Sequence, residues 1–76
     1  MIEKVLIDSI KEVLPDLEID KLLLEKSFSE NSIDSLDTMS IFLELKESGI
    51  DLTDEEIEKY CETIQSTSDL IKRKKI

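Results

Sequence analysis

A serine flanked by carboxylates is the feature of this 76-residue sequence best placed for chemistry, in the segment Asp34-Ser35-Leu36-Asp37. The segment follows a polar stretch, Ser27–Ser32, and begins a run that we expect to be helical. A serine at a helix start is by default a cap, and either Asp34 or Ser35 suits that role. A phosphodiester on Ser35 would face unpaired backbone N–H groups and the positive end of the helix dipole. The local physics therefore suits a phosphodiester modification of Ser35 by another enzyme.

Self-contained catalysis is not expected from the other residue types. The chain has no histidine, which is the usual near-neutral base and metal ligand, and Cys61 is its only cysteine. A Ser/His or Cys/His pair is therefore impossible, and the spaced oxygen ligands of an EF-hand are missing from the sequence. The many carboxylates of so acidic a chain are mostly solvated surface groups. We expect no enzyme activity, no catalytic residue and no metal site.

The helix expected over residues 35–48 would carry apolar side chains on two faces. At 100° per residue, one side would hold Ile41, Phe42 and Leu45. The roughly opposite side would hold a second apolar stripe of Leu36, Met39 and Leu43. The acidic residues Asp37, Glu44 and Glu47 would lie beside this second stripe. Two stripes indicate either a helix sandwiched between others or a helix with one core face and one partner face. The flanking acids favour the partner face.

Four helices and no strand are expected to position these residues. Apolar periodicity and cap residues predict helices over about 2–14, 35–48, 54–63 and 67–74. The chain would form one domain over residues 1–76. The fold class is then all-α, a small four-helix bundle with a long loop between the first two helices and a short third helix.

The expected helix boundaries follow from a few residues. Pro15 should end the first helix, and Gly49 should end the second as a left-handed cap. Thr53 should open the third helix, with Glu56 completing a capping box. Ser66 is the cap predicted for the fourth helix.

The long connection over residues 15–34 is too apolar to lie in solvent. We expect it to cross the helices and complete the core, with a short helical turn near residues 20–25 and an exposed stretch over 27–32. Its apolar side chains are Leu17, Ile19, Leu22, Leu23, Leu24 and Phe28. Phe42, Tyr60 and Cys61 are interpreted as core residues as well.

Negative charge is concentrated around Ser35. The chain has 19 acidic and 10 basic side chains, a net charge of −9, and four of the bases form the tail 72–75. Between residues 27 and 69, 12 acidic side chains face 2 basic ones, a net charge of −10. This balance disfavours nucleic acid as a partner and favours enzymes with basic docking patches. The basic tail is expected to be a frayed, solvated terminus.

Location is limited by two further observations. The longest apolar runs are three residues long, so no stable membrane insertion is expected. A single cysteine fits a reducing compartment. We expect a cytoplasmic monomer.

Together these features resemble the acyl carrier proteins over nearly the whole chain. In that family a serine in an Asp-Ser-Leu motif carries 4′-phosphopantetheine, and Asp34-Ser35-Leu36 matches that motif. The length, the acidity, the order of four helices and the long first loop are also similar. Phe28 before the motif, the turn Gly49–Leu52 and the segment Ser66–Ile71 add to the resemblance.

The resemblance implies a carrier rather than a catalyst. Ser35 would be the attachment site of 4′-phosphopantetheine, and Asp34 would help a phosphopantetheinyl transferase and its Mg²⁺ engage the serine. An acyl group held on the cofactor as a thioester would be delivered to acyl-transferring or synthase enzymes of a fatty-acid, polyketide or related pathway. The face that meets these partners would comprise Leu36, Asp37, Met39, Leu43, Glu44 and Glu47.

Two other interpretations stay open. The family commonly has Leu-Gly two to three residues before the aspartate, and here those positions are Asn31 and Ser32. This difference allows an interaction or regulatory module that keeps the carrier fold and is never modified. A discrete aminoacyl or peptidyl carrier is the second alternative.

Overall fold

Four α-helices and two short 3₁₀ helices make up the computed structural model, which describes residues 2–75. The α-helices are α1 (Lys4–Val13), α2 (Ser35–Glu47), α3 (Asp54–Tyr60) and α4 (Ile64–Lys74), and the 3₁₀ helices are η1 (Ile19–Lys21) and η2 (Ser29–Asn31). No strand occurs within residues 2–75, so the prediction of an all-α bundle with four helices is confirmed. None of the helices in this range is long and apolar enough to cross a membrane.

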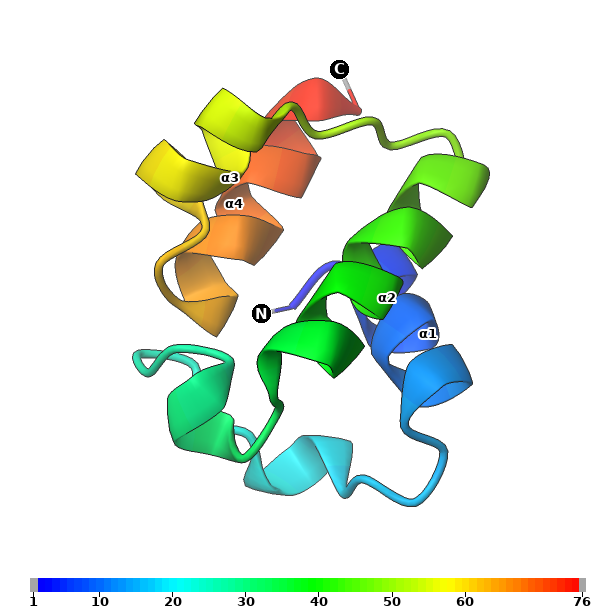
Figure 1. Ribbon diagram of the computed structural model, residues 1–76, viewed down its shortest axis with the longest axis vertical. Helices are drawn as coiled ribbons and strands as arrows, with labels where there is room; N and C mark the ends of the chain where they lie inside the picture. The colour runs from blue at the N-terminus through cyan, green and yellow to red at the C-terminus, as the bar shows by residue number, and fades with distance from the viewer. Residues whose placement is uncertain (1, 76) are drawn as a thin grey trace.

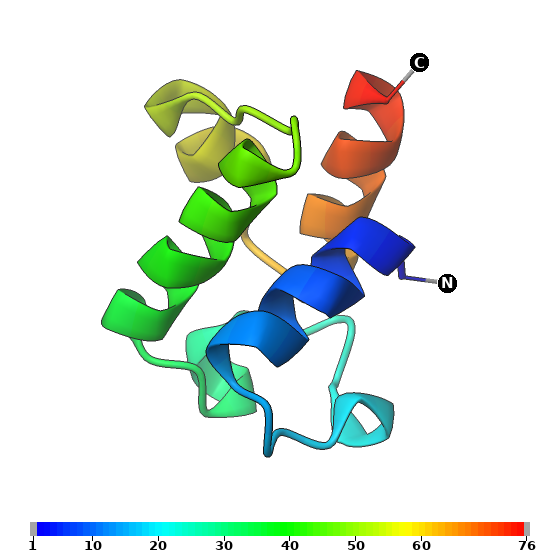
Figure 2. The same cartoon turned by 90° about the vertical axis from the view of Figure 1, so that its right-hand side faces the viewer.

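The helices are arranged as two pairs. The main contacts between helices are those of α1 with α2 and of α3 with α4, and Figure 1 shows the two pairs on opposite sides of the molecule. The connection between α1 and α2 closes the end of the bundle at which α2 begins (Figures 1 and 2). The last turn of α4 lies at the other end, where α2 leads into α3 (Figure 1).

The core is built from apolar side chains of α1, α2, α4 and the long connection. Its buried members are Leu6, Ile10, Phe28, Ile33, Ile41, Leu45, Ile64, Leu70 and Ile71. The core face predicted for the helix over 35–48 is confirmed at Ile41 and Leu45, which are fully buried, and Leu6 and Ile10 of α1 are fully buried opposite them. Burial of each such side chain contributes about 1.5–3 kcal/mol. By contrast, α3 has no buried residue.

The long connection between α1 and α2 lies against the core, as its apolar content predicts. Phe28 is buried, and Leu17, Ile19, Leu22 and Leu24 pack against the core. The prediction was wrong for Leu23, whose side chain is 58% exposed. Leu22–Leu24 is not helical, and in an extended segment successive side chains point in opposite directions. The middle leucine therefore faces solvent while its neighbours face the core.

Two helix boundaries match their predicted caps. Gly49 has a φ of 94°, so the left-handed end of α2 is confirmed. At the start of α3, Oγ1 of Thr53 accepts a hydrogen bond from the Glu56 N–H, and Glu56 accepts one from the Thr53 N–H. This capping box is the predicted one.

The predicted start of the fourth helix was wrong. The cap of α4 is Thr63 rather than Ser66, so the helix begins at Ile64. Oγ1 of Thr63 accepts a hydrogen bond from the Ser66 N–H at 3.0 Å, and Ser66 Oγ accepts one from the Thr63 N–H at 3.0 Å. Because α4 begins earlier, Ile64 lies in the core. The third helix is correspondingly shorter than predicted and ends at Tyr60.

The basic tail is part of the fold rather than a frayed terminus. Lys72, Arg73 and Lys74 form the last turn of α4. Lys74 Nζ lies 2.7 Å from Glu56 Oε1, and Lys75 Nζ lies 3.2 Å from Glu3 Oε2. The expectation of a frayed tail was wrong, because Lys74 and Lys75 pair with acids far away in the sequence, but residues 72–75 are exposed to solvent as expected.

Candidate functional site

The N-terminus of α2 is capped by Asp34, which decides between the two predicted caps. Oδ1 of Asp34 accepts a hydrogen bond from the Asp37 N–H at 2.8 Å. The Asp34 carbonyl accepts two more, from the Thr38 N–H at 2.9 Å and from the Thr38 hydroxyl at 2.7 Å. Ser35 is therefore the first residue of α2, and it is exposed. The serine does not serve as the cap and faces solvent at a junction of loop and helix.

The loop before Ser35 is stabilised by hydrogen bonds between its own residues and by one buried side chain. Ile33 is fully buried, and its N–H donates to the Phe28 carbonyl at 2.9 Å. Asn31 spans the loop, since its Oδ1 accepts from the Leu23 N–H at 2.7 Å and its Nδ2 donates to the Ser27 carbonyl at 2.8 Å. These contacts fix the direction from which the chain enters α2.

Two further details describe the turn that contains η2. Glu30 Oε1 accepts a hydrogen bond from the Ser27 N–H, and this bond lowers the pKa of the Glu30 carboxyl below its usual value. Ser32 has a φ of 65°, the left-handed conformation that favours glycine. The segment between η2 and α2 therefore contains a serine whose backbone conformation costs free energy for any residue with a side chain.

The second apolar stripe of α2 lies on the surface. Leu36, Met39 and Leu43 are 74%, 69% and 58% exposed. Ile41 and Leu45, which face the other way, are fully buried. The sandwiched arrangement is thereby excluded within residues 2–75, and α2 has one core face and one exposed apolar face. Such a concentration of exposed apolar side chains is typical of an interaction surface.

Carboxylates accompany this exposed face. Asp37 and Glu44 are half-buried and Glu47 is exposed. Desolvation raises the pKa of the Glu44 carboxyl above its usual value, and repulsion from Glu47 and Glu12 adds to the effect. We call Leu36, Met39 and Leu43 with Asp37, Glu44 and Glu47 the acidic face. Its negative charges repel each other, so an approaching positive charge would relieve that repulsion.

An open groove of about 730 Å³ lies between α2 and α3. Its apolar lining comprises Met39, Phe42, Leu43, Leu52 and Ile57. Lys46, Asp51 and Asp54 add charged groups. Met39 and Leu43 belong to both the groove and the acidic face, so the two surfaces are continuous. We call this feature the α2–α3 groove.

The sequence interpretation missed the groove, although a signal for it was present. Leu52 and Ile57 occupy the positions just before the Thr53 cap and four residues after it. Apolar residues at these two positions form a hydrophobic staple in many helices. Phe42 is half-buried, with its ring centroid 5.7 Å from that of buried Phe28, and it lines the groove from the core side.

Tyr60 and Cys61 differ from their expected placement. Tyr60 is 45% exposed rather than in the core, because α3 ends there and buries none of its residues. Cys61 is half-buried, and desolvation raises the pKa of its thiol. No group of three or more His, Cys, Asp or Glu side chains in residues 2–75 is arranged to hold a metal ion.

A scan against models of protein families finds no match to the chain, and searches of curated proteins and of solved structures find none either.

Proposed function

We propose that this chain is an acyl carrier protein, whose Ser35 receives 4′-phosphopantetheine. The observation that carries the proposal is the placement of Ser35. It is exposed, it is the first residue of α2, and the same helix presents the acidic face. The chain would hold and deliver an acyl group, and the chemistry would belong to its partner enzymes.

Attachment of the cofactor requires a transferase, coenzyme A and Mg²⁺. The Ser35 oxygen attacks the phosphorus that bears the pantetheine in the pyrophosphate of coenzyme A. A new bond forms between the serine oxygen and this phosphorus, which gives a phosphodiester. The bond from the same phosphorus to the bridging oxygen of the pyrophosphate breaks, and adenosine 3′,5′-bisphosphate leaves with that oxygen. The serine proton passes to a base of the transferase. Asp34 Oδ1 is occupied by the helix cap, so Asp34 would engage Mg²⁺ through Oδ2.

The acidic face is proposed as the docking surface for the transferase and for synthase or acyl-transferring enzymes. Its apolar side chains would enter shallow pockets of the partner, and its carboxylates would pair with basic residues around them. Asp37 stands within one turn of Ser35, so a docked partner would have the serine at the edge of its interface.

The α2–α3 groove is proposed to hold the chain's own thioester-linked acyl group. The groove begins beside Met39, about 6 Å along the helix axis from Ser35 at 1.5 Å per residue. Its lining is mainly apolar, so a hydrocarbon chain lying there would leave water.

Intact mass tests the attachment directly. The protein is incubated with coenzyme A, Mg²⁺ and a broad-specificity phosphopantetheinyl transferase, and a gain of one phosphopantetheine is expected. Ser35→Ala is the matched control and should show no gain. Absence of a gain in the unaltered protein with several transferases would contradict the proposal.

The same assay tests the acidic face. Asp37→Lys should lower kcat/KM for loading by about three- to tenfold, because a repulsive charge slows association with a basic partner. Asp8→Lys, an equal charge change at an exposed position of α1, is the control. Equal effects of the two variants would contradict a docking role for this face.

The alternative of an unmodified module depends on the sequence before Asp34. Ser32 has the left-handed backbone conformation that favours glycine, so this chain makes the turn before Asp34 without a glycine. Because an unmodified module would keep the same fold, the loading of Ser35 in the mass assay decides between the two interpretations. An aminoacyl or peptidyl carrier would differ only in its cargo, which mass analysis of the acyl group on the purified protein would identify.

A further inference from the structure

The helix α3 forms one side of the α2–α3 groove without being anchored in the core. It contributes Asp54 and Ile57 to the groove, and none of its seven residues is buried. Its main packing partner is α4 rather than α2. The position of this side of the groove must therefore depend on contacts other than apolar burial.

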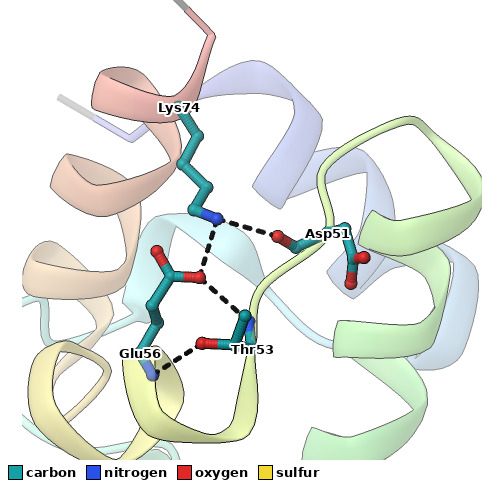
Figure 3. A network of polar contacts seen from close by, with 4 residues as sticks. All are labelled: Asp51, Thr53, Glu56 and Lys74. Carbon is teal, nitrogen blue, oxygen red and sulfur yellow. Dashed lines mark hydrogen bonds and ion pairs between the residues drawn. The ribbon is translucent and has the colours of Figure 1, made fainter.

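The first such contact lies at the N-terminus of α3 (Figure 3). Lys74 Nζ lies 2.7 Å from Glu56 Oε1 and donates a hydrogen bond to the Asp51 carbonyl at 2.9 Å. The same Glu56 oxygen accepts the capping hydrogen bond of the Thr53 N–H at 3.0 Å. One ammonium group thus connects the end of α4 with both the cap of α3 and the segment leading into it.

The Lys74–Glu56 pair is less open to solvent than an ordinary surface pair. The two side chains are 29% and 25% exposed, whereas those of the Lys59–Glu55 pair within α3 are 60% and 75% exposed. Screening by water and salt is weaker for partly buried charges. Lys74 also contributes the largest part of the effect that lowers the pKa of the Glu56 carboxyl.

The second contact lies at the C-terminus of α3. The Arg73 guanidinium carbon lies 5.3 Å from the centre of the Tyr60 ring, within the range of a cation–π interaction. Arg73 and Lys74 are adjacent residues of α4, and their partners are the last residue and the third residue of α3. The two cations together hold α3 near both of its ends.

We propose that Lys74 and Arg73 are positioning residues that fix α3 against α4 and thereby set the width of the α2–α3 groove. Loss of either contact frees α3 and the segment 51–53 to shift relative to α2, and the width of the groove changes. The assignment of an acyl group to the groove rests on the proposed carrier function. The contacts that position α3 do not depend on that function. The test therefore uses the unmodified protein and a neutral apolar dye.

Hydrogen exchange measures the first consequence. Lys74→Met should accelerate exchange of the α3 backbone amides by about three- to tenfold, the range expected for loss of one partly buried ion pair. The amides of α1 and α2 should keep their rates. Lys72→Met removes an equal charge from the same turn without removing either contact, so α3 should exchange as in the unaltered protein. Lys74→Arg should restore most of the protection because it keeps the charge.

Dye binding measures the second consequence. The dissociation constant of N-phenyl-1-naphthylamine should change by about threefold or more in Lys74→Met, and Lys74→Arg and Lys72→Met should leave it nearly unaltered. A merely structural lysine would accelerate exchange in every helix equally. That result, or an unchanged dye affinity beside a loosened α3, would overturn the proposal.

Two more variants protect the test from a failure of Lys74→Met to fold. Glu56→Gln keeps an acceptor for the Thr53 N–H but loses the charge facing Lys74, so it should loosen α3 in the same way. Tyr60→Leu removes the ring beneath Arg73 and should accelerate exchange in the last turn of α3 by about two- to fivefold. Unchanged exchange there would overturn the part assigned to Arg73. Loading of Ser35 is scored separately by mass, so the two proposals fail independently.

Discussion

The pair α1–α2 and the helix α3 are held in place by different kinds of contact. Leu6 and Ile10 of α1 and Ile41 and Leu45 of α2 are fully buried, so this pair is fixed by the removal of apolar surface from water. In α3 no residue is buried, and its contacts include a capping box, the ion pair of Glu56 with Lys74 and the cation–π contact of Tyr60 with Arg73.

This difference separates two tasks that the proposed carrier must perform. Ser35 and the acidic face belong to α2, whose position is set by many non-directional contacts that no single polar change removes. The α2–α3 groove has one side on this fixed helix and one side on a helix that a few directional contacts hold. On this proposal, the docking surface on α2 stays in place even where a change at Lys74 or Arg73 shifts the other side of the groove.

The largest expected effect comes from truncating matched isoleucines in the two regions. Ile41→Ala should lower the free energy of unfolding by about 2–5 kcal/mol, because it leaves a cavity in the core. Ile57→Ala should lower it by less than about 1 kcal/mol, since Ile57 lines an open groove. Urea denaturation of both variants measures the difference. Equal losses would show that α3 contributes to the core as much as α2 does.

A smaller effect is expected at the left-handed serine that leads into α2. Ser32→Gly should raise the free energy of unfolding by about 0.5–1 kcal/mol, because relief of the backbone strain exceeds the added entropy of the unfolded chain. Ser32→Val should lower it by about 1 kcal/mol or more, since a β-branched residue tolerates this conformation least. The same denaturation assay applies. A destabilising glycine would mean that the Ser32 side chain itself supports the loop.

The smallest expected effects concern two carboxyls whose pKa values shift in opposite directions. The pKa of Glu56 lies below 4.5, chiefly through its hydrogen bond with Lys74, so its ionised form stabilises the fold above pH 4.5. That stabilisation is lost as the pH falls through the lowered folded-state pKa. Glu56→Gln should therefore be less stable than the unaltered protein at pH 7, with the difference shrinking below pH 4.5.

Glu44 should behave in the opposite way. Desolvation and like charges raise its pKa above 4.5, so the ionised carboxylate disfavours folding at neutral pH. Protonation removes this penalty as the pH falls through the raised folded-state pKa. Glu44→Gln should be slightly more stable than the unaltered protein at pH 7. This difference in stability should disappear as the pH falls through the raised pKa of Glu44 toward 4.5. Thermal midpoints recorded between pH 3 and pH 7 would compare the two variants, and parallel curves would contradict both assignments.

Features set by neighbouring residues were predictable from the sequence. The two apolar stripes of α2 follow from the spacing of its residues, and the burial of Ile41 opposite exposed Met39 confirms them. The Thr53–Glu56 capping box and the left-handed Gly49 depend on residues no more than three positions apart. The role of Ser35 stays a prediction, since geometry alone does not reveal a modification.

Features set by distant residues were not predictable in this way. Serine is a slightly better N-cap residue than threonine, so local preference favours Ser66. The helix is capped by Thr63 instead, which lets Ile64 enter a core made by other helices. Lys74 lies 23 residues from Asp51 in sequence, so nothing in the local pattern of the basic tail indicates that contact. The exposure of Tyr60 likewise follows from how α3 packs rather than from its apolar periodicity.

The partial burial of Cys61 has a practical consequence for chemical labelling. Its thiol has a raised pKa and is partly shielded, so at neutral pH little of it is present as the reactive thiolate. A form carrying the arm proposed for Ser35 would hold a second thiol at the end of a flexible, solvated chain. Maleimide would modify that thiol well before Cys61, and the fast phase of a native thiol titration would report the fraction of molecules that carry the arm.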